Sequence, residues 1–417
     1  MATNVDRSTK SVSSPGALFA ACCFALVVSA VAFGIRSDIA GDLAKHFNTT
    51  KEAVGWFGMG GAFWGFAISI FIGGQLCDWL GMKTLLLVAC VMQLAGVALT
   101  VFAPSLAILG VATWSIGIGN GLVEASINPM VASMFPNEKT RRLNLLHVWW
   151  PGGIVIGGLA GYFLGSHVSW QIKQSLVFIP AVIYGILFIG LKVPPTERVQ
   201  SGVSTGAMYK ELLRPLFLVF LFCMLLTAAT ELGPGQWMGT IMTKAAGSGI
   251  LVLVWISLIM AVARLFAGPV VHKLSPTGIL LSCAAVSIVG LLLMSKATSP
   301  TSAFVAATVF AVGVCYFWPT MLGFTSERFP AGGALLMGLM GTAGMTAAGF
   351  AQPVMGSLLD KFKDNPALSL QYAAFLPAVL VIIFGIVFLR DLSKGGYKAE
   401  RLSARAEEAA ALADGEA

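Results

Sequence analysis

The sequence predicts an all-α membrane protein that crosses the bilayer many times, and two observations carry this prediction. Of the 417 residues, 57% are hydrophobic and only 11% are charged, whereas soluble domains carry about 25% charged residues. Apolar runs of about 20 residues, each long enough to cross the hydrocarbon core as a helix, recur along the whole chain. A soluble core could not bury so much apolar surface, so we expect the lipid bilayer to cover it.

The apolar runs divide into twelve predicted spans. The first six cover residues 16–40, 52–76, 84–103, 106–131, 143–165 and 171–192. The last six cover residues 214–242, 249–271, 277–296, 301–325, 332–359 and 370–390. The first run follows a basic start and superficially resembles a secretory leader, but it is long and a second span follows closely. We therefore interpret it as a span.

A polar connector divides the spans into six and six. It holds the stretch PPTERVQSGVSTG, whose composition is typical of a linker between two bundles. The sequence thus predicts an amino-terminal six-helix bundle, a cytoplasmic linker, a carboxy-terminal six-helix bundle and a cytoplasmic tail, over residues 1–192, 193–213, 214–390 and 391–417.

The basic residues orient the spans. With the amino terminus inside, most of the 26 Lys and Arg residues lie in inner segments, as the positive-inside rule requires, so we expect both termini in the cytoplasm. The same residues stand singly at the ends of spans and form no basic stripe. Their scatter excludes a nucleic-acid-binding protein, despite the net charge of +7.

Neither an enzyme nor a metal site is indicated. The seven cysteines lie in or beside apolar runs without CxxC spacing, and the four histidines are dispersed, so no metal cluster is predicted. One of the four histidines, His147, is expected at the edge of a loop. No phosphate-binding loop, nucleophile elbow or HExxH motif occurs. We therefore expect no catalytic residue, no cofactor and no metal.

The connection between the second and third spans reads GQLCDWLGMKT and fits the pattern G-x-x-x-D-x-x-G-x-K with Gly74, Asp78, Gly81 and Lys83. Gly74 allows two helices to approach closely, and Gly81 permits a tight turn. Asp78 and Lys83 can exchange charge-assisted hydrogen bonds with each other or with a neighbouring helix end. The four residues are therefore predicted to form a latch that gates the inner side.

This pattern resembles the loop signature of the major facilitator superfamily. The resemblance implies two six-helix bundles related by pseudo-symmetry, with a solute site near the middle of the membrane. In the second half, the stretch RLFAGPVVHKLSP is a degenerate echo of the loop. Arg264 at its start is predicted to act in a gate or to pair at a helix end.

The fourth span contains an ionisable residue in the stretch GNGLVEASINPM. Glu124 lies four residues from both Asn120 and Asn128, a spacing that places all three on one helix face. A charge in hydrocarbon is costly and is by default a functional candidate. Glu124 is thus predicted to bind the solute and to carry a proton, with Asn120 and Asn128 beside it. The alternative is a structural carboxylate paired with Arg36 or with another helix.

The same span resembles the fucose permease branch of the superfamily through the pattern GxxLExxxNP, which Gly119, Leu122, Glu124, Asn128 and Pro129 fit. That branch contains proton- and sodium-coupled sugar carriers.

The seventh span contains ELGPGQW, and the fucose permease branch has a Glu followed by a Trp six positions later in this helix. The resemblance implies a sugar site whose wall includes Glu231, Gln236 and Trp237.

The first span departs from the fucose permease pattern. It reads FGIRSDIAGD, where Asp38 lies close to the position of the family's acidic residue without a clean register, and Arg36 is an addition. Asp38 is therefore a second candidate for proton coupling. For Arg36 three roles stay open: it binds the carboxylate of an anionic solute through its planar fork, it neutralises Asp38 or Glu124, or it lies at the interface.

Three tryptophans are further candidates for the wall of a solute site. Trp150 precedes Pro151 in the fifth span and either stacks on a sugar ring or anchors the helix at the interface. Trp237 and Trp318 lie deeper in their spans and are predicted to line the cavity.

These observations predict a secondary transporter that works by alternating access in the cytoplasmic (inner) membrane. We expect a small polar solute, a sugar or a sugar derivative, driven by a proton gradient, with sodium as the alternative ion. One alternative is an organic-anion carrier that uses Arg36; another is a facilitative carrier or nutrient receptor without ion coupling. The expected partners are the solute, the ion and the lipid bilayer, and the chain is expected to be a monomer.

Overall fold

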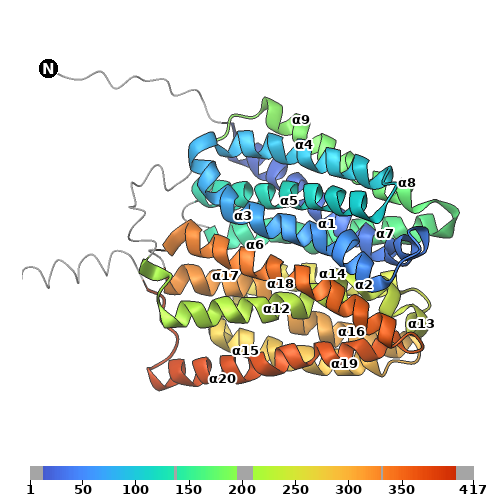
Figure 1. The fold of residues 1–417 in the computed structure, drawn as a ribbon. Helices are drawn as coiled ribbons and strands as arrows, with labels where there is room; N and C mark the ends of the chain where they lie inside the picture. The colour runs from blue at the N-terminus through green and yellow to red at the C-terminus, as the bar shows by residue number, and fades with distance from the viewer. Residues whose placement is uncertain (1–12, 136–138, 195–209, 330–331, 401–417) are drawn as a thin grey trace, which may run out of the picture.

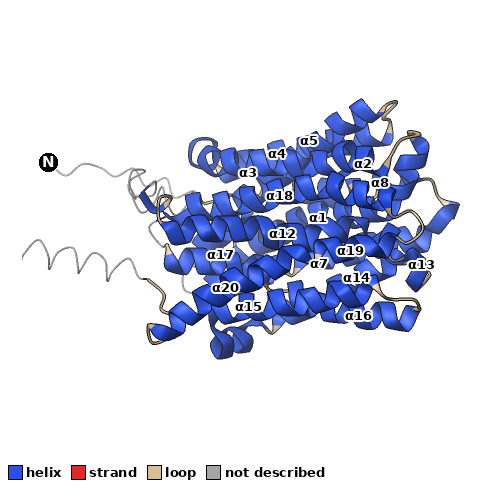
Figure 2. Ribbon diagram, turned by 60° about the horizontal axis from the view of Figure 1, so that its bottom comes forward, coloured by secondary structure: helices blue, strands red, loops and turns tan. Residues whose placement is uncertain are grey.

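The fold is that of a computed structural model, which describes residues 13–135, 139–194, 210–329 and 332–400. Within these ranges the chain is helical and contains no strand (Figure 2), which confirms the predicted all-α class. The predicted linker over residues 193–213 falls largely outside the described residues. The proposed division into two bundles, a linker and a tail therefore stays a prediction.

The first half of the chain forms the upper part of the molecule in Figure 1. Its helices are α1 (Pro15–His46), α2 (Lys51–Val54), the π-helix η1 (Gly55–Gly60), α3 (Gly61–Leu80), α4 (Met82–Val101), α5 (Leu106–Met134), α6 (Lys139–His147), α7 (Trp149–Leu164), η2 (Gly165–His167), α8 (Trp170–Ser175) and α9 (Phe178–Gly190).

The second half forms the lower part in the same view. Its helices are α12 (Pro215–Ile241), α13 (Thr243–Ala246), α14 (Gly249–Leu265), α15 (Ala267–Ser295), α16 (Pro300–Val314), α17 (Phe317–Arg328), α18 (Gly333–Lys361), η4 (Pro366–Leu368), α19 (Ser369–Ala373) and α20 (Phe375–Ser393).

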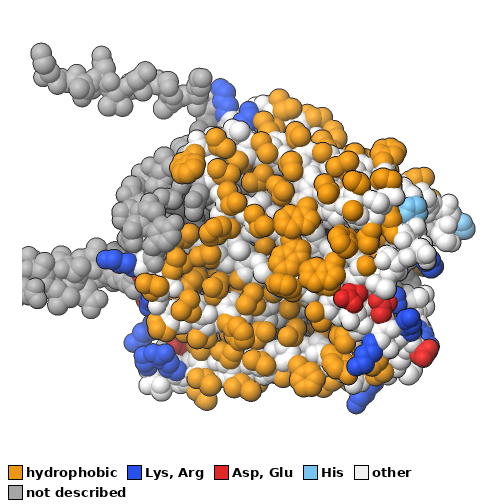
Figure 3. All heavy atoms as spheres, viewed as in Figure 1, with side chains coloured by type: hydrophobic (Ala, Val, Ile, Leu, Met, Phe, Trp, Pro, Cys, Tyr) orange, Lys and Arg blue, Asp and Glu red, His pale blue; other side chains and the backbone are white. Residues whose placement is uncertain are grey.

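Ten segments of the described chain are long and apolar enough to cross a membrane, and α14 is a shorter apolar helix. The 29-residue α18 is a further long helix, rich in Gly, Ala and Met. The outer surface fits a bilayer: Figure 3 shows hydrophobic side chains over the middle of one face, with charged side chains gathered toward the two ends. The chain is thus a multi-pass membrane protein, while the number of twelve spans and the cytoplasmic termini stay predictions.

The helices run roughly along one direction, so the molecule has two ends (Figure 1). At the end that we call the termini end, the backbone N–H of Ser13 donates to the carbonyl of Lys192 at 3.1 Å. At the opposite end, the backbone N–H of Glu52 on α2 donates to the carboxylate of Asp360 on α18 at 3.1 Å.

The two halves meet along two seams. In the first, α1 packs against α12, where Gln236 Nε2 donates to the carbonyl of Phe33 at 2.9 Å and Ser37 Oγ donates to the carbonyl of Gly235 at 3.3 Å. In the second, α18 packs against α3, where Thr342 Oγ1 donates to the carbonyl of Ala67 at 3.3 Å.

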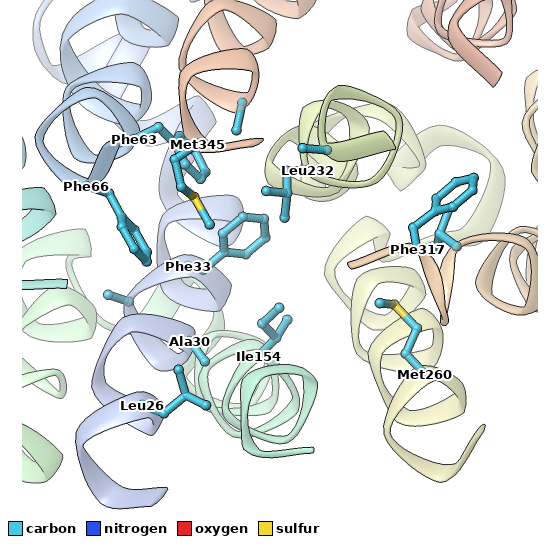
Figure 4. Packing of buried hydrophobic residues seen from close by; sticks show 14 of the residues in the cluster. Leu26, Ala30, Phe33, Phe63, Phe66, Ile154, Leu232, Met260, Phe317 and Met345 are labelled. Atoms are coloured by element: carbon cyan, nitrogen blue, oxygen red, sulfur yellow. The ribbon is translucent and has the colours of Figure 1, made fainter. Parts of the chain in front are cut away.

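Between the seams, aromatic and thioether side chains fill the space. Figure 4 shows Phe33, Phe63 and Phe66 of the first half gathered near Met345 and Leu232 of the second.

Several predicted spans are interrupted inside the molecule. The eighth span ends at Leu265, earlier than expected. Helix α15 then kinks at Ser275, the residue before Pro276, which has a φ of 58°. The tenth span breaks between α16 and α17 at Cys315 and Tyr316. Such breaks leave backbone carbonyls without helical partners, and the site uses one of them.

Candidate functional site

A polar cluster lies where the two halves meet, and its part from the first half is built on α5. Asn128 Nδ2 donates to Glu124 Oε2 at 2.7 Å, which agrees with the predicted shared helix face. His147, the last residue of α6, places Nε2 at 3.2 Å from Asn128 Oδ1. Glu124 and His147 are both buried, so this chain of side chains is shielded from the surroundings.

The second half contributes Arg264 and Glu231 to the same cluster. Arg264 Nη2 lies 3.7 Å from Glu231 Oε1, and its Nε donates to the carbonyl of Cys315 at 2.9 Å, at the break between α16 and α17. Its Nη1 also donates across the seam to the carbonyl of His147 at 3.4 Å. We call Glu124, Asn128, His147, Glu231 and Arg264 the central cluster.

The two carboxylates of the central cluster differ in their partners. Glu231 faces Arg264, whereas no cation of the described chain lies within ion-pair distance of Glu124, whose hydrogen bond comes from Asn128. A buried carboxylate without a cation is stable only when it is protonated or when it meets a ligand. The proton-coupling role of Glu124 stays a prediction, while Arg264 links the two halves through its hydrogen bond to the carbonyl of His147.

Arg36 lies on α1 in the first seam and is only 4% exposed. Its Nε and Nη1 atoms have no hydrogen-bond partner, although its neighbour Ser37 is bonded to α12. No carboxylate of the described residues pairs with Arg36. The alternative in which Arg36 neutralises Asp38 or Glu124 thus finds no contact in the structure.

Asp38 is instead held by a different cation. Its Oδ2 lies 2.6 Å from Lys173 Nζ on α8, and both side chains are largely buried. The pair lines a cavity of about 910 Å³ at the opposite end, with walls from α1, α7, α8, α12 and α14. The structure therefore does not join Asp38 to Glu124, and the coupling role predicted for Asp38 remains a prediction.

Asn120 also lies away from the central cluster. Its Oδ1 accepts from Gln93 Nε2 on α4 at 2.8 Å, and Gln93 Oε1 accepts from Tyr184 on α9 at 2.7 Å. Residues four apart on a helix are rotated by about 40°, so Asn120 and Asn128 diverge in direction. Asn120 serves packing inside the first half, and its predicted contact with solute is not supported by this geometry.

The tryptophans divide into two groups. Trp237 is fully buried and donates Nε1 to the carbonyl of Gln352 at 3.2 Å, so it fastens α12 to α18. Trp150 and Trp318 are half-buried; Trp150 packs edge-on against Phe33 at 6.0 Å between ring centroids. These two rings can face a solute, whereas Trp237 has a structural partner already.

The predicted gating loop is a tight turn. Gly81 has a φ of 81°, a backbone conformation that favours glycine. At Gly74 a Cβ would meet open space, so the close approach of two helices predicted at Gly74 is not found in this structure. Lys83 Nζ donates to the carbonyls of Ile189 and Leu191 at 2.9 Å each, so it caps the end of α9. The side chain of Asp78 lies outside the described residues, and its part in a latch stays a prediction.

Sequence reasoning missed His147 and Lys173 as partners of the predicted residues. The sequence predicts His147 at a loop edge, but it is buried beside Asn128; its position inside the fifth predicted span, four residues before Pro151, is a signal that could have indicated this. In the described part of the chain, no group of three or more His, Cys, Asp or Glu residues could hold a metal ion.

Comparison with known proteins identifies relatives. The model of the Major Facilitator Superfamily matches residues 17–334. The gentisate transporter of Corynebacterium glutamicum is 25% identical over 49% of this chain and 48% of its own length. The niacin transporter of Acinetobacter baylyi is 28% identical over 42% of this chain and 38% of its own. For the hexuronate transporter of Bacillus subtilis the identity is 31%, over 34% of each chain. The chain thus spans about half of the length of the curated relatives it matches, or less.

Solved structures share the fold over nearly the whole chain. The E. coli fucose:proton symporter superposes with a TM-score of 0.65 at 17% identity, covering 88% of this chain and 98% of that one. The E. coli xylose transporter superposes with a TM-score of 0.73 at 13% identity, covering 88% and 96%. Together with the family match, this agreement shows that the chain belongs to the Major Facilitator Superfamily.

Proposed function

We propose that this protein is a secondary transporter for a small organic acid, which it moves across the cytoplasmic membrane by alternating access. The observation that carries the proposal is the buried, unpartnered guanidinium of Arg36. A buried cation without a counter-charge is strongly unfavourable, and a planar guanidinium is suited to hold a carboxylate through two parallel bonds. A bound carboxylate would supply the missing partner.

The named relatives agree with this class of solute. Gentisate and hexuronate are carboxylates, and niacin is a carboxylic acid, although each match covers half of the relative or less. Trp150 and Phe33 lie beside the seam that contains Arg36, so an aromatic or ring-shaped acid could pack there. The central cluster supplies the second requirement of an ion-coupled carrier, a buried carboxyl group that can exchange a proton.

A neutral sugar is the second candidate solute. It is favoured by the hydrogen-bonded pair of Glu124 and Asn128, the pair through which the fourth span resembles the fucose permeases. An amide and a carboxyl group can bind hydroxyl groups, but this candidate leaves the unpartnered Arg36 unexplained. We therefore place it after the organic acid.

The test compares solutes that differ only in the charged group. Proteoliposomes with the full chain are loaded with an imposed pH gradient and offered nicotinate against nicotinamide, and glucuronate against glucose. We expect uptake of the acid of at least one pair. Because a hydrogen bond to a charged group contributes about 1.5–3 kcal/mol, Arg36→Gln should lower kcat/KM about 10- to 100-fold for that acid.

Lys296→Gln is the matched control, because it removes an exposed cation far from the seam and should leave kcat/KM unchanged. Preference for the neutral member of each pair, with no effect of Arg36→Gln, would contradict the organic-acid proposal and favour the sugar. If no solute accumulates under a proton or sodium gradient, ion-coupled transport itself is wrong and a facilitative carrier or receptor takes its place.

A further inference from the structure

A second cavity, of about 350 Å³, lies at the termini end of the second half, remote from the central cluster. It is formed where α12 begins, α17 ends and α20 ends. Its walls contain four cations and two carboxylates, together with apolar side chains: Arg214, Arg328, Arg390, Lys394, Asp391, Glu400, Pro215, Leu216 and Val387.

Two of the four cations are already engaged. Arg214 donates to Glu400 Oε1 at 2.7 Å and to Glu211 Oε2 at 3.0 Å, and the hydrogen bond with Glu400 raises the pKa of Arg214 above its ordinary value. Arg328 Nη2 donates to Asp391 Oδ1 at 2.7 Å. These bonds account for both carboxylates of the cavity.

The remaining donors have no partner among the described residues. Arg390 and Lys394 are exposed side chains for which no ion pair is formed, and Arg328 Nε is buried without a hydrogen bond. The cavity therefore presents the surplus positive charge of Arg390 and Lys394 to whatever enters it. Charge-assisted bonds of this kind are the ones that anionic oxygens make.

The position of the cavity identifies the source of such oxygens. Pro215 opens the α12 span and Ser393 closes the α20 span, so the cavity lies at the level where hydrocarbon gives way to headgroups. Leu216 and Val387 line it, and the neighbouring Leu218, Ile386 and Leu389 are 51%, 64% and 64% exposed. An apolar surface thus leads from the lipid-facing side of the helices directly to the unpartnered cations.

We propose that this cavity binds the phosphate headgroup of an anionic membrane phospholipid. Arg390 and Lys394 hold the phosphate oxygens, and the acyl chains lie against α12 and α20. Basic pockets at the ends of membrane helices are suited to anionic headgroups, and the surplus of cations over carboxylates selects them over zwitterionic ones. The lipid would tie the start of α12 to the end of α20 and stabilise the second half.

The test measures thermal unfolding of the full chain in nanodiscs of phosphatidylcholine, with and without phosphatidylglycerol. Binding to the folded state raises Tm by mass action, so phosphatidylglycerol should raise the Tm of the wild type. The double variant Arg390→Gln/Lys394→Gln should lose this response, with phosphatidylglycerol affinity reduced about tenfold or more. The charge-preserving variant Arg390→Lys/Lys394→Arg should retain it.

Lys273→Gln is the matched control, since it removes an exposed lysine outside the cavity and should respond as the wild type does. The Tm in pure phosphatidylcholine shows whether the double variant is folded; if it is not, Lys394→Gln alone should show a reduced response. An undiminished response in the folded glutamine variants would overturn the proposal. Equal stabilisation by inorganic phosphate at matched concentration would also overturn the proposal, because it would indicate a soluble anion. The same holds if phosphatidylglycerol has no effect on the Tm of the wild type.

Discussion

At the scale of single residues, Glu124 differs by its partners from two other buried or largely buried carboxylates, Glu231 and Asp38. Glu231 faces Arg264, and Asp38 is bound to Lys173, whereas Glu124 receives a hydrogen bond from the neutral Asn128. This difference in partners is the reason why we propose Glu124 as the group on which a proton gradient acts.

We expect Glu124→Gln to uncouple transport from protons without preventing solute binding. Glutamine still accepts the Asn128 amide but cannot exchange a proton. A gradient of one pH unit supplies a factor of about ten in accumulation for each coupled proton, and the variant should lose this factor. Exchange of labelled solute between the two sides without a gradient should persist. Both quantities are measured in proteoliposomes.

Asp364→Asn is the control for this experiment, since Asp364 is an exposed carboxylate at the opposite end. It should accumulate solute as the wild type does. Unchanged gradient-driven accumulation in Glu124→Gln would show that another group carries the proton.

The sequence predicts candidate residues for the site but not all of their pairings. Glu124 was predicted because an ionisable side chain in hydrocarbon is costly, Glu231 by resemblance to the fucose permease branch, and the pair of Glu124 with Asn128 by their spacing on one helix. Contacts between distant segments were not predicted: Arg264 meets His147, 117 residues away. Such pairs depend on how helices pack in three dimensions, and no local spacing encodes that.

At the scale of helices, close packing of α1 against α7 shapes the first half. A Cβ at Gly157 would lie 2.5 Å from the carbonyl oxygen of Val31, and one at Gly153 would lie 2.5 Å from Ala30 Cβ. Small residues allow this approach, and in a membrane such contacts replace the hydrophobic effect as the force between helices. The position of Arg36, further along α1, depends on this contact.

We therefore expect Gly157→Ala to destabilise the protein, although alanine favours helices. Forcing an extra methyl against a backbone carbonyl costs about 1–3 kcal/mol, which outweighs the gain of about 1 kcal/mol in helix propensity. The Tm of Gly157→Ala, followed by intrinsic tryptophan fluorescence, should fall below that of Gly152→Ala. At Gly152 on the same helix, a Cβ would meet only Trp149, at 3.9 Å. Equal Tm values in the two variants would show that the contact is loose.

Hydropathy predicted segments that coincide with the ten long apolar helices of the described chain, but it did not predict where the helices break. The spans follow from composition alone because lipid requires about 20 apolar residues per helix. The break at Cys315 is instead matched by a tertiary contact, since the carbonyl of Cys315 accepts from Arg264 of another helix, whereas the kink at Ser275 precedes Pro276. The hydropathy of a segment does not indicate whether a side chain of another helix will bind one of its carbonyl groups.

At the scale of the whole molecule, the opposite end is held closed along the second seam. A Cβ at Gly356 on α18 would lie 2.5 Å from the carbonyl oxygen of Lys51, and a Cβ at Gly55 would lie 2.7 Å from Pro353 Cα. The carboxylate of Asp360 accepts from the backbone N–H of Glu52, in the first turn of α2, where helix ends favour negative charge. For alternating access, these contacts between α2, η1 and α18 must separate at some stage of the cycle.

We expect a cross-link at this contact to stop uptake. In Glu52→Cys/Asp360→Cys the two positions approach closely, since the Glu52 nitrogen lies 3.1 Å from the Asp360 carboxylate. A short, reducible thiol cross-linker should therefore join them. The seven native cysteines are all buried, so labelling should be confined to the introduced pair. Uptake by proteoliposomes should fall to background after cross-linking and recover when the linker is reduced.

Two controls separate immobilisation from damage. Each single cysteine variant, treated with the same reagent, should keep its uptake. The pair Phe362→Cys/Tyr372→Cys joins two positions within the second half, whose rings lie 5.5 Å apart, and should also transport when cross-linked. If the Glu52–Asp360 pair is fully cross-linked and uptake continues at the wild-type rate, the two halves do not separate at this end. The solute would then have to pass by another route, such as the cavity lined by Asp38 and Lys173, with α2 and α18 remaining together.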